Sequence, residues 1–241
     1  MSNASYSPDD RPQIRVGDTS WPVRLVHHAQ SRRYKLIFDG ARGELRLTLP
    51  RRASAARALK WASEQQDWLA AQVGKADAPV LVAPGATVPL FGVPRRIEWS
   101  PAAPRAVRLA DDALVVGGPA ETVGRRIERW LKAEALAIME RESREIADRA
   151  GLRVGRVGVG DPRSRWGSCT HDGDLRYSWR LVMAPNHVRR ATVAHEVAHL
   201  QHMDHSPAFH ALVDTLHDSD VGMARAWLRR EGRGLHRYRF T

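Results

Sequence analysis

The sequence contains a single cysteine, Cys169, among its 241 residues. One cysteine cannot form an intrachain disulfide, and it cannot supply the several thiolates of a cysteine-based zinc site. A chain with so little cysteine fits a reducing compartment. The scarcity of cysteine therefore excludes a disulfide-stapled secreted fold.

Long apolar runs are also absent. No uninterrupted apolar stretch reaches the roughly 20 residues that a transmembrane helix needs. The first residues, Met1 to Arg11, include serine, proline and aspartate and have no apolar core of the kind found in signal peptides. We therefore expect a soluble, cytoplasmic protein that has no membrane partner.

Lysine is also in short supply. Only four of the 38 basic residues are lysine, in a chain whose formal net charge is +11. Arginine suits phosphate recognition, but an arginine- and alanine-rich genome produces the same composition. The excess charge is divided almost equally between the two halves of the chain. A nucleic-acid partner therefore stays open, while a solvated basic surface explains the charge without one.

The residues that are present indicate a folded globular protein. The hydrophobic fraction is 43% and there are eight tryptophans, so the chain can bury a core in one large domain or two small ones. Apolar and polar residues alternate early in the chain, which indicates strands, and a helical period follows. The elements predicted there are strands at 23–26, 34–38 and 44–49, a helix at 54–73 and hairpins across 78–116.

Helical periodicity dominates the second part of the chain. Ser206-Pro207 places serine at a helix cap and proline at the first helical position, and Asn186 can cap the preceding helix. The elements predicted there are helices at 120–150, 187–203, 207–216 and 220–230, with strands at 153–159 and 175–183 on either side of the loop 161–174. We therefore expect an α+β protein with a loose leader (1–20), a β-rich region with one helix (21–118) and a helix-rich domain (119–241).

The most informative segment is Ala194-His195-Glu196-Val197-Ala198-His199. Residues four apart share one face of a helix, so His195 and His199 can present two imidazole nitrogens to one metal ion. Glu196 points from a neighbouring part of the surface, where it can reach a metal-bound water. The surrounding residues are mostly apolar, which indicates a buried helix in which Glu196 and the histidines need partners. The pattern therefore predicts the zinc site of a hydrolase, with Glu196 as the base that takes a proton from the attacking water.

A third protein ligand is expected, because catalytic zinc usually has three. His202 lies about 10.5 Å along the helix axis from His195, which is too far for the same ion. His205 precedes a predicted helix start, where the chain can turn back, so we prefer it and keep His210 as the alternative. The interval from His199 to His205 equals that of the metzincin pattern, but His202 replaces the glycine of that pattern. We therefore expect the helix to continue for about a turn before it bends.

The groups that could assist the reaction are less well defined. Tyr177, Arg180 and His210 are candidates for stabilising the oxyanion. In the segment 164–169, Gly167 permits a tight turn and Cys169 suits the role of a small buried filler.

Several segments together resemble the YgjP-like metallopeptidases, zinc-dependent bacterial peptidases of the gluzincin-like type that are distantly related to the SprT and WLM proteases. The resemblance runs from about Val23 to Leu216, and the segments that carry it are 164–169, 177–185, 195–199 and 204–209. It implies a zincin-like domain, with an active-site helix and a small antiparallel sheet, after a β-rich N-terminal region. It also implies zinc on His195, His199 and His205, with Glu196 catalytic.

The chain departs from the family pattern at two positions. It has Asp204 where asparagine is frequent, and His210 where tryptophan usually follows Phe209. Neither change touches a residue implied to bind zinc, but the second keeps His210 open as the alternative ligand.

Three functional hypotheses follow. The leading one is a cytoplasmic zinc metallopeptidase that acts on proteins or peptides. The second is a DNA-associated protease or nucleic-acid-binding protein, motivated by the net charge and by the distant likeness to proteases that act on proteins crosslinked to DNA. The third is a zinc-stabilised protein without turnover, against which the intact Glu196 argues. No pattern in the sequence indicates an oligomeric state.

Overall fold

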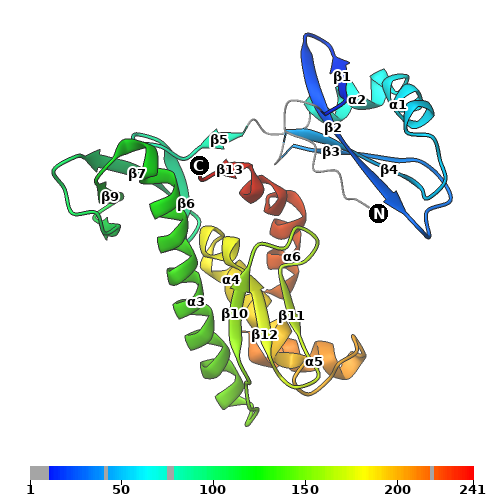
Figure 1. Cartoon of the computed structure of the whole chain (residues 1–241). Helices are drawn as coiled ribbons and strands as arrows, with labels where there is room; N and C mark the ends of the chain where they lie inside the picture. The colour runs from blue at the N-terminus through cyan, green and yellow to red at the C-terminus, as the bar shows by residue number, and fades with distance from the viewer. Residues whose placement is uncertain (1–10, 41–42, 75–78, 218–219) are drawn as a thin grey trace. The chain divides into compact units, whose positions relative to one another are not determined.

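The computed structural model describes residues 11–40, 43–74, 79–217 and 220–241, and the chain divides into two compact units, Met1–Pro79 and Val80–Thr241 (Figure 1). The fold is mixed α+β, as the sequence predicts. Residues 80–118, which the sequence pattern groups with the N-terminal region, lie in the second unit.

The first unit is a four-stranded sheet with two helices. Part of the expected leader forms the first strand of this sheet, in which Ile14 and Val16 are buried. The strand has only four residues, so its alternation of apolar and polar residues does not stand out in the sequence. The sheet order is β1-β2-β4-β3, with β2 and β4 parallel and the other pairs antiparallel. Its strands are β1 (Gln13–Val16), β2 (Thr19–His28), β3 (Lys35–Asp39) and β4 (Glu44–Pro50).

The helix predicted at 54–73 is two helices, α1 (Ala55–Ser63) and α2 (Gln66–Gly74). The Ser63 hydroxyl and the Gln65 amide both donate to backbone carbonyls one turn back, at 2.7 and 3.2 Å. Side-chain bonds of this kind compete with the helical ladder, and the helix is interrupted at residues 64 and 65. The core of the unit is formed by Ile14, Val16, Val23, Leu36, Leu45, Leu47, Leu49, Ala58, Ala62 and Leu69.

The second unit begins with strands joined as hairpins, as predicted. Backbone bonds run from Phe91 N–H to the Val182 carbonyl at 2.8 Å and from Gly92 N–H to the Met183 carbonyl at 3.2 Å. These bonds explain why the region belongs with the second unit. The sheet order is β6-β7-β9-β8, and β5 pairs with β13. The strands are β5 (Val80–Leu81), β6 (Thr87–Leu90), β7 (Val93–Ser100), β8 (Arg108–Ala110), β9 (Ala113–Gly117) and β13 (Tyr238–Arg239).

A long helix follows the sheet (Figure 1). After the short helix η2 (Ala120–Thr122), α3 (Val123–Arg149) presents a buried stripe with helical spacing. The stripe consists of Val123, Ile127, Leu131, Ala135, Ile138, Met139, Ile146 and Ala147.

No helix among the described residues combines the length and the apolarity needed to cross a membrane.

The small sheet of the second unit differs from the expectation in two respects. It is mixed and not antiparallel, because β12 (Leu175–Ser178) pairs in parallel with β10 (Val157–Gly160) and antiparallel with β11 (Gly167–Cys169). The predicted strand at 175–183 also ends early, and its second half is the helix η3 (Trp179–Met183). All residues of η3, including Arg180, are buried. Its sequence therefore lacks the alternation of buried and exposed positions that would distinguish a strand from a helix.

The remaining helices agree with the predicted positions apart from their ends. Ser206 caps its helix by accepting from the Phe209 N–H at 3.4 Å, and Asp220 caps the next by accepting from the Gly222 N–H. Asn186, expected as a cap, is instead a helical residue and Pro185 holds the cap position without a side-chain bond. The helices are α4 (Asn186–Ala198), α5 (Pro207–Leu216), α6 (Val221–Arg230) and η4 (Gly232–Arg237).

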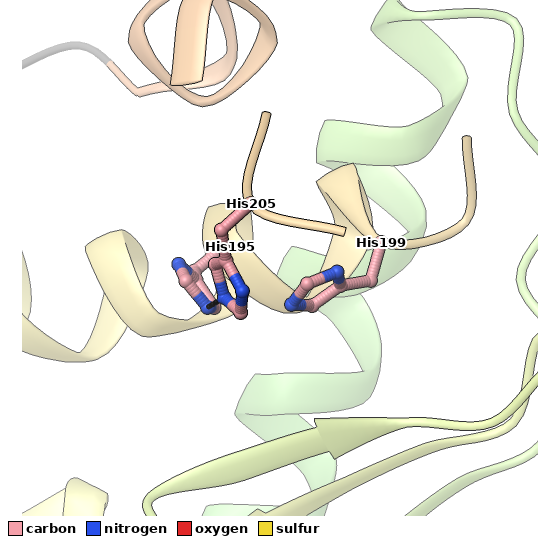
Figure 2. A group of neighbouring side chains, drawn as sticks. All are labelled: His195, His199 and His205. Atoms are coloured by element: carbon pink, nitrogen blue, oxygen red, sulfur yellow. Dashed lines mark hydrogen bonds between the residues drawn. The ribbon is translucent and has the colours of Figure 1, made fainter. Parts of the chain in front are cut away.

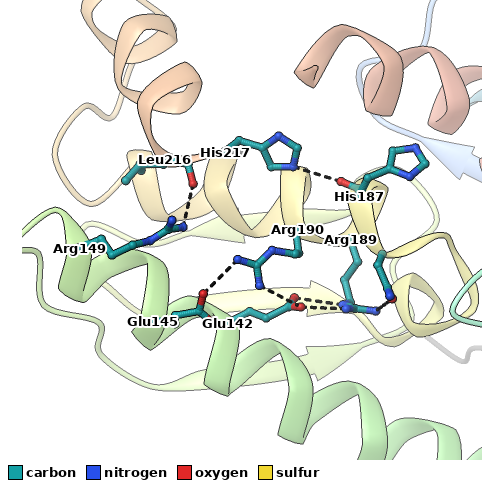
Figure 3. A network of polar contacts seen from close by, with 9 residues as sticks. Glu142, Glu145, Arg149, His187, Arg189, Arg190, Leu216 and His217 are labelled. Atoms are coloured by element: carbon teal, nitrogen blue, oxygen red, sulfur yellow. Dashed lines mark hydrogen bonds and ion pairs between the residues drawn. The ribbon is translucent and has the colours of Figure 1, made fainter. Parts of the chain in front are cut away.

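A buried ion pair between side chains joins α3 to α4. The Arg189 guanidinium donates to both carboxylate oxygens of Glu142 at 2.8 and 3.0 Å, and the two side chains are only 5% and 4% exposed. Arg190 lies 3.6 Å from Glu142 and 3.1 Å from Glu145 (Figure 3). Arg189 also donates to the Asn186 side-chain oxygen at 2.8 Å. This network holds the start of α4 against α3.

Breaking the buried ion pair should destabilise the second unit strongly. We expect Glu142→Gln to lower the free energy of unfolding by about 3–5 kcal/mol, because the Arg189 charge is left buried without its counterion. Glu140, two residues earlier on α3, forms an exposed pair with Arg144, so Glu140→Gln should cost at most about 0.5 kcal/mol. Denaturant unfolding measures both values. Equal costs would show that the buried pair contributes no more than a surface pair.

Candidate metal centre

The structure brings three histidines from two segments together. His195 lies in the last turn of α4, His199 follows the helix as its cap, and His205 lies just before α5. The ligand atoms of the three rings are all within 4.8 Å of one another, and the Nε2 atoms of His195 and His205 are 3.3 Å apart (Figure 2). This arrangement could hold a metal ion.

The end of α4 makes this grouping possible, and it differs from the prediction. The helix was expected to reach about Met203 but ends at Ala198. The N–H groups of Leu200 and Gln201 bond three residues back, to Val197 and Ala198, at 3.0 and 3.2 Å. Such bonds tighten and close the last turn, which lets the chain return toward His199 within a few residues.

The ring of His199 is oriented by the turn that follows it. Its Nδ1 lies 2.9 Å from the carbonyl oxygen of His202. A carbonyl can only accept, so Nδ1 carries the proton and Nε2 keeps a free lone pair. The fully buried Phe209 packs against all three rings, with centroids 4.5 to 4.9 Å away. The histidines therefore share one apolar support.

The other histidines considered from the sequence lie differently. His202 contributes its backbone carbonyl to His199. The ring of His210 has its centroid 6.4 Å from that of His205, and His210 is not a member of the three-residue group.

Burial and mutual repulsion keep two of the rings uncharged. Burial, then the charges of His199, His205 and Arg225, lowers the pKa of His195 to about 4. Burial also lowers the pKa of His199, although its bond to His202 opposes this effect. A neutral imidazole has a lone pair for a metal ion, so neither ring needs to lose a proton at neutral pH before it binds one.

Glu196 is buried beside these rings, with 5% of the residue exposed. Burial raises its pKa to about 7, and the charge of Arg165 opposes this rise. The backbone of β11 lies against this carboxyl group: a Cβ on Gly167 would stand 2.5 Å from both Cγ and Oε1 of Glu196. A side chain at position 167 would therefore displace the Glu196 carboxyl group, which lies between α4 and the strand.

A cavity of about 280 Å³ adjoins Glu196 and His195. Two of its lining residues, Arg165 and Arg225, were not assigned a role from the sequence. Arg165 lies in the segment 164–169, where the sequence pattern indicates roles for Gly167 and Cys169 but none for the arginine, and nothing in the sequence singles out Arg225. The lining comprises Arg165, Trp166, Gly167, Ala191, Thr192, His195, Glu196, Val221, Ala224, Arg225 and Leu228.

Two of the oxyanion candidates have structural partners elsewhere. The buried Tyr177 hydroxyl lies 2.9 Å from the Ser143 hydroxyl, and Arg180 donates to the Asp161 carboxylate at 2.7 and 3.0 Å. Neither lines the cavity.

Cys169 is half-buried, and burial raises the pKa of its thiol to about 11, with the charge of Glu196 as the next largest cause. A thiol with this pKa is a poor nucleophile at neutral pH.

Comparison with known proteins identifies the domain. A family model described as the YgjP-like metallopeptidase domain matches residues 34–231. The search of the curated proteins and the search of the solved structures found no match. The match covers most of the chain, including every residue of the candidate centre, and it confirms the resemblance seen in the sequence.

Proposed function

Because the chain belongs to the YgjP-like metallopeptidase family, we propose that it is a zinc-dependent peptidase in which His195, His199 and His205 hold the ion and Glu196 is the general base. The observation that carries the proposal is the grouping of three imidazole ligand atoms within 4.8 Å, with Glu196 and His195 lining the same cavity.

The donor set fits zinc. Two nitrogen ligands of a tetrahedral zinc ion, each about 2.0–2.1 Å from it, are separated by about 3.3 Å, and the Nε2 atoms of His195 and His205 are 3.3 Å apart. Imidazole suits zinc among the metals available to proteins. Three protein ligands also leave the fourth position that a catalytic zinc site requires.

The chemistry divides between the ion and Glu196. Zinc, when bound, supplies a Lewis acid that polarises a carbonyl group and acidifies water. The Glu196 carboxylate accepts a proton from the attacking water while the water oxygen bonds to the carbonyl carbon. Glu196 then returns that proton to the nitrogen as the C–N bond breaks, which leaves one new carboxyl group and one new amine. A carboxyl group whose pKa is about 7 is suited to both transfers.

The strand β11 can position the peptide. It lies at the edge of its sheet, where the order is β10-β12-β11, and its Gly167 lies against Glu196. An extended peptide can add to such an edge through backbone hydrogen bonds. The scissile bond would then run past the Glu196 carboxyl group.

Metal removal tests the proposed function. The purified chain should carry about one zinc ion and should cleave denatured casein or a mixed peptide library. Treatment with ortho-phenanthroline should abolish cleavage and added zinc should restore it, because the water is activated only with the ion in place. The non-chelating meta isomer is the matched control and should have no effect.

The outcomes separate the remaining hypotheses. A bound zinc ion without cleavage of any peptide would favour a zinc-stabilised protein without turnover. A chain that binds no metal would contradict the site itself.

A further inference from the structure

The cavity beside Glu196 has an apolar wall. Ala191 from α4 and Ala224 from α6 are 5% and 1% exposed, and Trp166 and Leu228 contribute half-buried side chains. The volume of about 280 Å³ is just below the range for pockets that hold a whole small-molecule ligand, which begins at about 300 Å³. A cavity of this size and lining suits one side chain of a bound peptide.

Two arginines are among the residues that line this cavity. Arg165 comes from the loop before β11 and Arg225 from α6, and both residues are exposed. The positive charge of Arg165 acts to lower the pKa of Glu196, and the positive charge of Arg225 acts to lower the pKa of His195. Neither guanidinium forms a hydrogen bond or an ion pair with any of the described residues. Both remain available to a ligand.

Other arginines of the same unit have carboxylate partners. Arg180 pairs with Asp161, Arg189 with Glu142 and Arg156 with Asp174. Arg165 and Arg225 form no such ion pair with any described residue, and both line the cavity beside the proposed reaction centre.

A second basic cavity continues from the first. It has a volume of about 360 Å³ and shares Trp166 and Leu228 with the first cavity. Arg225 and Arg229 are four residues apart on α6 and therefore share one face of that helix. The remaining lining residues are Arg163, Ser164, Arg229, Arg233 and His236. Among the described residues, Glu196 is therefore the one acidic residue that lines either cavity.

We propose that these two cavities select acidic peptides, with a substrate carboxylate bound by Arg165 and Arg225 next to the scissile bond. This inference rests on the proposed peptidase function. The apolar wall suits the methylene groups of a glutamate side chain, and a guanidinium binds a carboxylate with directed, charge-assisted hydrogen bonds. The carboxylate belongs either to an acidic side chain or to the C-terminus of the peptide. A nucleic-acid strand fits less well, because Arg165 and Arg225 line a mostly apolar cavity that also contains the acidic Glu196.

Cleavage-site mapping tests the preference. A degenerate peptide library, prepared with free and with amidated C-termini, is incubated with the zinc-loaded full chain, and the cleavage sites are read by mass spectrometry. We expect aspartate or glutamate to be enriched at one fixed distance from the scissile bond. Enrichment that persists in amidated peptides assigns the carboxylate to a side chain. Cleavage confined to free termini assigns it to the C-terminus.

Arginine variants then test the two residues. For a matched pair of peptides with and without the carboxylate, the ratio of kcat/KM values should fall by about 10- to 100-fold in Arg165→Gln/Arg225→Gln, since each charge-assisted bond contributes about a factor of 10 or more. The double lysine variant retains the charge and should restore part of the ratio. Arg129→Gln removes an exposed arginine of α3 and should leave the ratio unchanged. The arginines are exposed, so folding should be preserved, which melting temperatures verify.

Three outcomes would overturn the inference. Cleavage without an acidic preference, or a ratio unchanged in the double glutamine variant, contradicts it and leaves the peptidase function standing. Competition by a single-stranded oligothymidylate that depends on both arginines, without an acidic preference, assigns the cavities to nucleic acid. The absence of cleavage by the zinc-loaded wild type removes the proposed function and this inference together.

Discussion

Glu196→Gln should lower kcat for peptide cleavage by about 10²- to 10⁴-fold, the contribution that a positioned general base makes. Glutamine has nearly the same shape as glutamate but cannot accept the proton of the attacking water. The three histidines are untouched, so the variant should retain about one zinc ion per chain. Cleavage rates measure the loss of catalysis, and the metal content measures zinc retention independently.

The substitution should not weaken the metal-free fold. Burial raises the pKa of Glu196 from an ordinary value of 4.5 to about 7. A carboxyl group with a raised pKa contributes stability that is complete below its ordinary pKa and is lost as the pH rises through the folded value. Relative to Glu196→Gln, the metal-free wild type should therefore lose stability between about pH 4.5 and about pH 7. Thermal unfolding on either side of this interval checks that lost cleavage does not reflect lost folding.

Zinc retained with undiminished cleavage would exclude Glu196 as the base. Loss of the zinc as well would instead show that Glu196 supports the metal site, and the base would have to be sought elsewhere in the cavity.

His205→Ala should weaken zinc binding by more than about 100-fold. Loss of a mere supporting contact to a metal ligand costs 10- to 100-fold in affinity, so loss of a ligand should cost more. His205 is exposed, and its removal should disturb the fold little. Competition against a chelator of known affinity measures the change. The thermal stabilisation that zinc confers on the wild type should disappear in parallel.

His210→Ala is the matched control for this experiment. Its ring neighbours that of His205, with centroids 6.4 Å apart, and it was the alternative third ligand on sequence grounds. We expect the zinc affinity of His210→Ala to equal that of the wild type. The reverse result, with zinc lost in His210→Ala and kept in His205→Ala, would make His210 the third ligand.

The local features of the site could be predicted from the sequence because they depend on residues that are near in the chain. The spacing of His195 and His199 follows from the helical repeat, and Ser206-Pro207 indicated the start of α5 by its capping chemistry. The hairpins and α3 could likewise be predicted, because their apolar residues recur every two and every 3.6 residues. The errors fall where the period is short or lost, as in β1 with its four residues and in the fully buried run of η3.

Only the tertiary structure decided how these pieces meet. The end of α4 at Ala198, five residues before the expected end, brings His205 within 3.3 Å of His195. The close approach of β11 to Glu196 at Gly167, and the presence of Arg165 and Arg225 in the lining of one cavity, involve segments far apart in the sequence. Such contacts depend on the packing of α3, α4, α6 and the small sheet against one another, and no local period encodes them. The sequence by itself therefore determined the family and the pair His195 and His199, while the folded chain determined which groups surround them.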